Sequence, residues 1–335
     1  MTGRRRLLKA SVLSLALSLA LMGSGTRADL VPTAPQARLR IEFHSHFLLN
    51  LHSFLLDAAR NPQHLDELDW VLPRDEDEAQ RLQAALRFYR ESFDRLDPLF
   101  DERMAAIKVA LSQVDDGQRQ PPELAAEPVL QAQLASVAPL YARCLWPAQD
   151  RQNQAWIASA RALDERYGAE IQARVEHYLH HAFPTAPVRD DVVVNTGHWA
   201  GAYTSEEPRQ TVMPSGRRDY QGYAALEMLY HEASHIGVTD TVEQAIAAQL
   251  PAGQRDPGLW HAVQFYTVGA VTRQVLQERA AVDYQPYAQA GGVLKRLAGG
   301  QTEALLDSHW QDYLQGRSSF EDAIAAMSRR LVFTR

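Results

Sequence analysis

The sequence contains a single cysteine, Cys144, among its 335 residues. One cysteine cannot form an intrachain disulfide, so the fold has to be stable without a covalent cross-link, and a cysteine-based structural metal site is excluded. Apolar and aromatic side chains flank the cysteine, at Tyr141, Leu145 and Trp146. This setting predicts a core position for Cys144 rather than a nucleophilic one.

Basic residues are also scarce relative to acidic ones. Lys and Arg together number 34 and Asp and Glu 41, which gives a formal net charge of −7 at pH 7. Removal of residues 1–28 would take away five basic residues and no acidic one, and so lower the charge from −7 to −12. An acidic protein repels phosphate backbones and anionic lipids, so nucleic acid and anionic membranes are not expected partners.

Long apolar runs are absent except near the N-terminus, at residues 7–22. This run follows a basic start at residues 4–6 and precedes a small-x-small site at residues 26–28. The order is typical of an export signal, and the run is too short for a stable membrane span. We therefore expect residues 1–28 to be a cleaved signal peptide and the mature protein to be periplasmic or secreted. Residues 4–9 fit a twin-arginine motif, although Gly3 stands where Ser or Thr is usual, and a general secretory signal fits them equally.

Helical periodicity dominates residues 29–185. Apolar residues recur at helical spacing in the stretches 39–59, 75–100, 104–114, 130–145 and 150–183, and Gly168 could interrupt the last of these. The pattern then changes to short runs typical of strands at 191–195, 199–204 and 210–213. We predict an α+β fold that is mostly α. A helical region at 29–185 should precede a catalytic region at 186–335, in which the strands form a small antiparallel sheet.

The most informative stretch is His231-Glu232-Ala233-Ser234-His235, which has the pattern H-E-x-x-H in a predicted helix at 224–236. Residues four apart lie on one face of a helix, so both imidazoles can bind the same metal ion. Glu232 can then reach a water on that metal without being a ligand. Two histidine nitrogens, a bound water and a carboxylate are the minimum apparatus of a zinc hydrolase, which predicts one Zn²⁺ per chain. The alternative is a surface helix on which these residues meet by chance.

The stretch at 223–237 resembles the zincin metallopeptidases, and the resemblance extends in a general way over about the last 150 residues. It implies that His231 and His235 bind zinc and that Glu232 is the general base. It also implies a third ligand further along the chain and, before the helix, a β-strand that binds extended substrate.

The third ligand does not follow the better-known spacings. A metzincin would have Gly and His where this chain has Val238 and Thr241, and glutamate-type zincins would have Glu near Gln254 or Arg255. Three residues remain as candidates: His261, Glu278 and Glu243. His261 lies on the apolar face of a predicted helix and should point inward. Glu278 is at a polar helix end, and Glu243 fits a capping box that begins at Asp240, so both have other roles available.

Four further residues are candidates for contact with the substrate. His198 lies beside the expected edge strand, where an extended peptide could pair with the main chain. Tyr223 on the motif helix, and Tyr284 and Tyr287 after the helix of His261, could donate a hydrogen bond to the oxyanion of an amide under attack.

Three histidines, His44, His46 and His52, fall in the first expected helix. They could line the cleft or hold a second metal, although His44 and His46 cannot share a helix face. A polar, hydrogen-bonded face of that helix is the simpler interpretation.

Taken together, these patterns predict an exported zinc-dependent hydrolase, foremost a metallopeptidase that acts on peptide or protein substrates. Two alternatives stay open. One is a zinc amidase or esterase with the same site and a non-peptide substrate. The other is a catalytically inactive metal-binding or interaction module.

Overall fold

In the computed structural model, residues 37–66, 73, 75–197, 201–256, 258–297 and 301–332 are described. The first half of this part is helical apart from one strand, β1 (Ile41–His44). Its helices are α1 (Phe47–Arg60), α2 (Gln63–Asp66), α3 (Glu76–Phe93), α4 (Glu102–Ser112), α5 (Pro128–Cys144), α6 (Trp146–Leu163) and α7 (Ala169–Leu179). Asp75 and Asp101 cap α3 and α4 by accepting hydrogen bonds from the main-chain N–H groups of Glu78 and Met104. The predominance of helix over strand confirms the predicted fold class.

The prediction of one helix over residues 39–59 is wrong at its start. Residues Ile41–His44 form β1, and α1 begins only at Phe47. His46 separates the two elements because its backbone is extended, with φ −93° and ψ 122°, and its Nδ1 accepts the N–H of Leu49 at 3.4 Å. Histidine is not among the residues that usually mark a helix start, so the sequence pattern alone does not reveal this cap.

Between α6 and α7 the helix widens into a π-helical turn, Asp164–Gly168, where an interruption at Gly168 was expected. The side chain of Asp164 receives hydrogen bonds from the Tyr230 hydroxyl at 2.6 Å and from Arg38 at 2.8 Å. A Cβ atom on Gly168 would overlap both Asp164 Oδ1 and the Tyr230 hydroxyl oxygen. A π-helical turn and a glycine therefore make room for a hydrogen bond that connects this helix to α8 (Tyr223–Ser234).

We expect Gly168→Ala to destabilise the protein by about 1–3 kcal/mol, because the added methyl group displaces the Tyr230–Asp164 pair. This loss exceeds the gain of about 1 kcal/mol that alanine brings to a helix. Gly117→Ala is the control, since a Cβ there meets nothing within 4 Å. Urea denaturation of both variants measures the difference, and equal midpoints would show that the π-helical turn accommodates the methyl group.

In the described part of the chain, four strands form one sheet in the order β1-β2-β4-β3. The other strands are β2 (Val188–Val193), β3 (Tyr203–Ser205) and β4 (Gln210–Pro214). β2 is parallel to both β1 and β4, and only β3 and β4 are antiparallel, so the sheet is mixed and the prediction of an antiparallel sheet is wrong. The parallel pair β1–β2 is possible because the helices α1–α7 supply the long crossover that such a pair needs. The boundary predicted between residues 185 and 186 lies between β1 and β2 in the sequence, so it separates two strands that are paired in the sheet.

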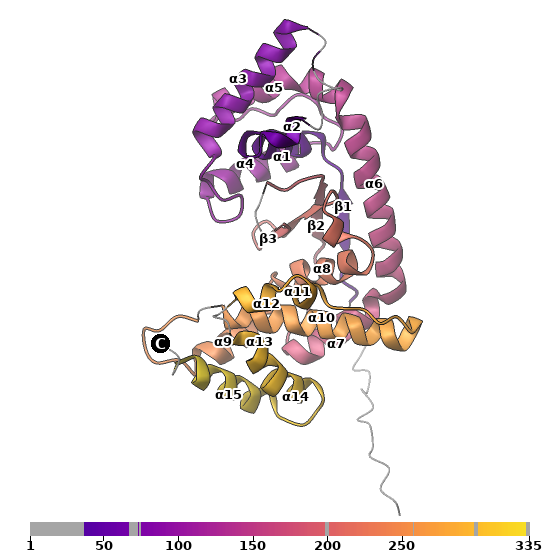
Figure 1. The fold of residues 1–335 in the computed structure, drawn as a ribbon, viewed down its shortest axis with the longest axis vertical. Coiled ribbons are helices and arrows are strands. Elements are labelled where there is room, and N and C mark those ends of the chain that lie inside the picture. The colour runs from indigo at the N-terminus through magenta and orange to yellow at the C-terminus, as the bar shows by residue number, and fades with distance from the viewer. Residues whose placement is uncertain are drawn as a thin grey trace, which may run out of the picture. The chain divides into compact units, whose positions relative to one another are not determined.

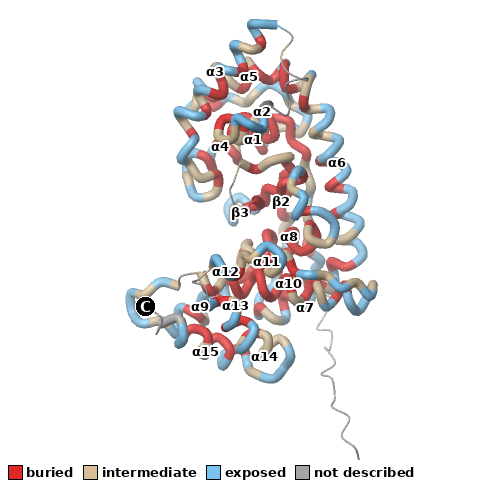
Figure 2. The backbone as a smooth tube through the Cα atoms, in the orientation of Figure 1, coloured by how far each residue is buried: buried red, intermediate tan, exposed pale blue. Residues whose placement is uncertain are grey.

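Both faces of the sheet are covered by helices (Figure 1). Val188, Val192 and Met213 join the larger apolar core, which includes residues of α6–α10 and α15. On the other face Val193 and Val212 pack against Leu49 of α1, next to the core of α1, α3, α4 and α5. Figure 2 shows the resulting buried positions on the strands and on the inner sides of these helices.

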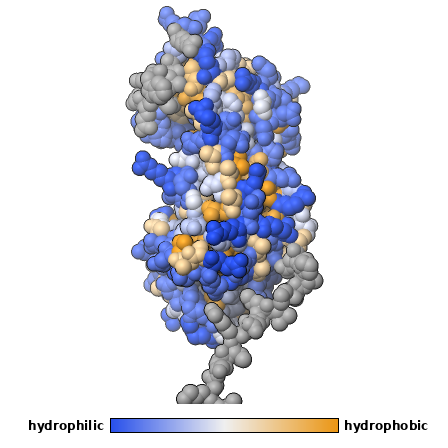
Figure 3. All heavy atoms as spheres, turned by 90° about the vertical axis from the view of Figure 1, so that its right-hand side faces the viewer, coloured by the Kyte–Doolittle hydropathy of each residue, from blue (hydrophilic) through white to orange (hydrophobic). Residues whose placement is uncertain are grey.

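The second half of the described chain begins with the strands and continues as helices. After α8 come α9 (Asp240–Ala247), α10 (Leu259–Ala280), α11 (Tyr287–Ala290), α12 (Val293–Arg296), α13 (Thr302–Leu305), α14 (Gln311–Leu314) and α15 (Phe320–Val332). None of the described helices has the length and hydropathy required to cross a membrane. The face that carries α6 is mostly hydrophilic, with hydrophobic residues scattered over it (Figure 3). The expected signal peptide, residues 1–28, lies outside the described residues.

Candidate metal centre

The H-E-x-x-H motif lies at the C-terminal end of α8. His231 and Glu232 belong to its last turn, and His235 is the C-cap residue with helical φ −63° and ψ −19°. The i, i+4 relation of the two histidines is therefore kept. Gly237 follows with φ +79°, a conformation that glycine adopts without strain, and the chain leaves the helix direction there.

His261, on the first turn of α10, completes a group of three histidines. One ring nitrogen from each of His231, His235 and His261 lies within 4.8 Å of the other two. The Nε2 atoms of His231 and His235 are 3.3 Å apart. Two nitrogens bound to one tetrahedral Zn²⁺ at about 2.0–2.1 Å are about 3.3 Å apart, so this pair has the spacing of metal ligands.

Two ring nitrogens in this group have no hydrogen-bond partner among the described residues, although both are buried. They are Nε2 of His261 and Nδ1 of His231. A buried polar atom without a partner is costly, and a metal ion at the centre of the group would satisfy the nitrogen of His261. The ring of His231 is oriented by stacking on Phe265, with 3.6 Å between ring centroids.

The three imidazoles are uncharged near neutral pH. Burial, together with the neighbouring His235 and His261, lowers the pKa of His231 well below its usual value. Burial, and the repulsion between protonated His235 and protonated His261, lower the pKa of His235 to about 3, and burial lowers that of His261 to about 4. Neutral imidazole is the form that binds metal, so the site is prepared for an ion without losing protons first.

Glu232 follows His231 in α8, and its side chain contacts the sheet. Its carboxylate Oε2 accepts a hydrogen bond from the Thr204 hydroxyl of β3 at 2.6 Å. Burial raises the pKa of Glu232 to about 7, against the lowering effect of Thr204. A carboxyl group with a pKa near 7 can both accept and return a proton at neutral pH.

A second set of hydrogen bonds fixes the distance between α8 and α10. Gln264 Nε2 donates to the main-chain carbonyl of His231 at 2.9 Å and to Ser234 Oγ at 2.7 Å. Ser234 Oγ in turn donates to the same carbonyl at 2.7 Å. Gln264 is three residues after His261, so it binds α8 from the helix face that also carries His261.

No protein-family model matches this chain, and comparisons with curated proteins and with solved structures found no match either. The resemblance to zincins therefore stays a prediction. The geometry of the site is what supports a function.

The two other candidates for the third ligand lie elsewhere. Glu278, near the end of α10, forms an ion pair with Arg174 at 2.6 Å. Glu243 accepts a hydrogen bond from the Thr239 hydroxyl at 3.0 Å. Thr239 rather than Asp240 is the N-cap residue of α9, so the predicted capping box is not formed as expected. Neither glutamate belongs to the histidine group.

The tyrosines predicted to contact substrate contact one another and nearby acids. The rings of Tyr223 and Tyr284 are 6.3 Å apart between centroids. The main-chain N–H of Tyr287 donates to both carboxylate oxygens of Glu227, at 3.2 and 3.1 Å, and its hydroxyl donates to Asp219 at 3.2 Å. Among the described contacts none joins these tyrosines to the three histidines. His198 lies outside the described residues.

The histidines of the first predicted helix have separate structural roles. His44 bonds Asp116 at 2.9 Å, and His46 caps α1 and bonds the carbonyl of Val114 at 2.9 Å. His52 bonds the Tyr89 hydroxyl at 2.8 Å inside the core of α1 and α3. They do not form a metal-binding group among the described residues.

Sequence reasoning missed Thr204 and Gln264. Thr204 reaches Glu232 from a strand far from the motif, and no local pattern marks it. Gln264 could have been found, because a polar side chain three residues after His261 on an otherwise apolar helix needs a buried partner.

Proposed function

We propose that this protein is a zinc-dependent hydrolase, foremost a metallopeptidase, with His231, His235 and His261 as zinc ligands and Glu232 as the general base. The observation that carries the proposal is the convergence of the three histidine nitrogens within 4.8 Å, together with a buried glutamate that directly follows His231 in α8. A structural zinc site is closed by four protein ligands, whereas three ligands leave one position for water or substrate.

Bound Zn²⁺ would lower the pKa of a water at the open position to about 7 and polarise the carbonyl group of the substrate. The protein supplies the proton transfers. Glu232 accepts the proton of the attacking water and returns it to the leaving amine, which its pKa of about 7 allows at neutral pH. Burial of Glu232 excludes bulk water from this exchange.

A peptide is the favoured substrate because β3 forms one edge of the sheet and contacts the motif helix through Thr204. An extended chain can pair with the free side of an edge strand and so pass the site in a fixed register. β3 is only three residues long, however, which favours a short substrate. A small amide or ester is therefore the second candidate. An exported location, periplasmic or secreted, remains part of the proposal on the basis of residues 1–28.

We expect the purified protein to contain about one zinc ion per chain and to hydrolyse members of a mixed peptide library, with loss of activity in a chelator and recovery with zinc. His235→Ala should lose the zinc. His64→Ala is the matched control, because His64 is exposed and bonds Asp57 instead. Elemental analysis after dialysis measures the metal. Wild-type protein that stays metal-free after treatment with zinc would refute the metal centre, and zinc-bound protein without any hydrolytic activity would favour a binding module.

A further inference from the structure

The hydroxyl of Thr204 lies within hydrogen-bond distance of two oxygens of Glu232, and its single proton can be donated to the nearer one, the carboxylate Oε2. Thr204 Oγ1 lies 2.6 Å from the carboxylate Oε2 of Glu232 and 3.1 Å from the main-chain carbonyl oxygen of the same residue. One hydroxyl therefore contacts both ends of one residue. A side chain that is bonded at its carboxylate from a fixed strand cannot rotate freely about its own torsions.

The position of Thr204 is set by the sheet. Thr204 pairs with Thr211 of β4, and Thr211 pairs with Asp190 of β2, so the three side chains form one row across three strands on the face toward α8. The Thr211 hydroxyl donates to Asp190 Oδ1 at 2.7 Å. Threonine is stiff at its first side-chain torsion, and the strand pairing fixes its backbone. The hydroxyl oxygen is thus held in a fixed position.

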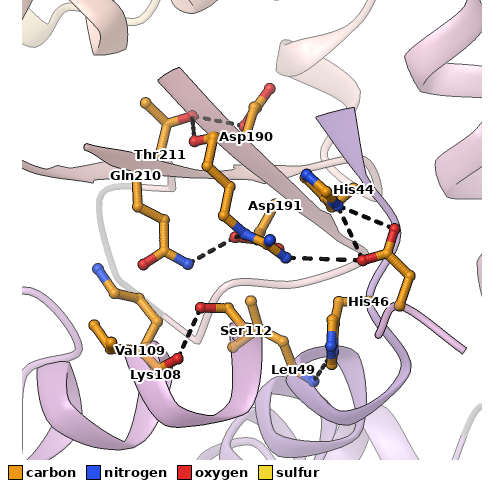
Figure 4. Close-up of polar contacts among 12 residues, drawn as sticks. His44, His46, Leu49, Lys108, Val109, Ser112, Asp190, Asp191, Gln210 and Thr211 are labelled. Carbon is orange, nitrogen blue, oxygen red and sulfur yellow. Dashed lines mark hydrogen bonds and ion pairs between the residues drawn. The ribbon is translucent and has the colours of Figure 1, made fainter. Parts of the chain in front are cut away.

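Figure 4 shows the two faces of the sheet at this row. Asp190 and Thr211 project to one side, and Asp191 and Gln210 project to the other, toward Lys108 and α1. Gln210 Nε2 donates to Asp191 Oδ2 at 2.6 Å, and Arg189 donates to both oxygens of Asp191. These groups bond one another on the far face, where Gln210 Oε1 has no hydrogen-bond partner among the described residues. On the face of α8, the described hydrogen bonds to the Glu232 carboxylate come from Thr204.

We propose that Thr204 is the positioning residue for the general base: its hydroxyl holds the Glu232 carboxylate in the orientation that serves the open position of the histidine site. This inference rests on the proposed function. In this proposal the edge strand β3 has two separate roles: its main chain can pair with substrate, and its Thr204 side chain orients the general base. A carboxylate that leaves this orientation loses proton transfer but leaves the three proposed zinc ligands in place, because these are the side chains of other residues, at the end of α8 and on α10.

The test compares Thr204→Val, which has the same shape without the hydroxyl, with Thr204→Ser, which keeps the hydroxyl. We expect Thr204→Val to keep zinc and KM while kcat falls about tenfold to a hundredfold, the usual effect of a lost hydrogen bond to a charged group. Thr204→Ser should recover kcat to within about threefold of wild type. Thr241→Val is the control, because it removes a threonine hydroxyl that bonds the main-chain carbonyl of His180 and not Glu232, and its kcat should stay within about threefold of wild type.

A second readout needs no substrate. Acetohydroxamate loses a proton when it chelates a metal and so requires an acceptor nearby, whereas azide binds the metal alone. Calorimetry on the zinc-loaded proteins should show about tenfold weaker acetohydroxamate binding in Thr204→Val and unchanged azide binding. If Thr204→Val fails to fold, Thr204→Ala takes its place in the comparison with Thr204→Ser.

The outcomes separate the two proposals. If the wild-type protein binds neither zinc nor acetohydroxamate, the proposed function itself is refuted. Zinc-loaded Thr204→Val with the kcat and acetohydroxamate affinity of wild type overturns the role of Thr204 and leaves the hydrolase standing. Equal losses in Thr204→Val and Thr204→Ser also overturn it, because the effect would then come from the strand and not from the hydroxyl.

Discussion

Glu232→Gln is expected to retain zinc and lose hydrolysis by about a hundredfold to ten-thousandfold in kcat. Glutamine has the shape of glutamate, and its carbonyl oxygen can still accept the Thr204 hydroxyl, so the fold and the histidine group should not change. The amide cannot accept a proton from water, however, and general-base catalysis is lost. Zinc content by elemental analysis and steady-state kinetics on a hydrolysed peptide measure the two effects separately.

Glu227→Gln is a close control for this experiment. Glu227 lies on the same helix, is fully buried, and has its pKa raised to about 7 by burial, as Glu232 has. Its carboxylate accepts the main-chain N–H of Tyr287 and so supports the start of α11 instead of facing β3. The control should keep kcat within about threefold of wild type. Equal activity of Glu232→Gln and wild type on every substrate would remove the hydrolase proposal.

The local parts of this site could be predicted from the sequence because helical spacing determines them. The i, i+4 relation of His231 and His235, and the inward direction of His261 on an apolar helix, both follow from the 3.6-residue period. Their convergence brings together two helices that Gln264 connects. The approach of His261 to His231 and His235 depends on this tertiary contact, and the sequence could only suggest it by elimination of other ligands.

Long-range pairing explains what could not be predicted. β1 and β2 are adjacent in the sheet although α1–α7 separate them in the chain, and a local pattern shows neither the pairing nor its parallel direction. β1 ends at His44, and α1 begins after an unusual N-cap residue, His46, so a helical apolar pattern concealed the strand. The contact between Thr204 and Glu232 could not be predicted for the same reason. Strand order and register decide where the Thr204 hydroxyl lies, and local periodicity does not report them.

Loss of the His261 imidazole is expected to have a large effect on zinc affinity. His261→Ala should weaken zinc binding by more than about a hundredfold, since even the loss of a residue that only supports a metal ligand costs about 10–100-fold in affinity. The metal-free variant should fold normally, because the imidazole that is removed has a buried Nε2 without a hydrogen-bond partner among the described residues. Competition with a chelator of known affinity measures the zinc dissociation constant.

Glu278→Ala and Glu243→Ala accompany His261→Ala in this experiment and should bind zinc as wild type does. Glu278 is engaged by Arg174, and Glu243 by Thr239, so neither needs a metal ion as a partner. Removal of either glutamate side chain would at most lower the stability of the fold by the small amount that a partly exposed polar contact contributes. If instead His261→Ala binds zinc as tightly as wild type while either glutamate variant does not, the site uses a glutamate as its third ligand. The approach of His261 to His231 and His235 would then be a feature of core packing and not of metal binding.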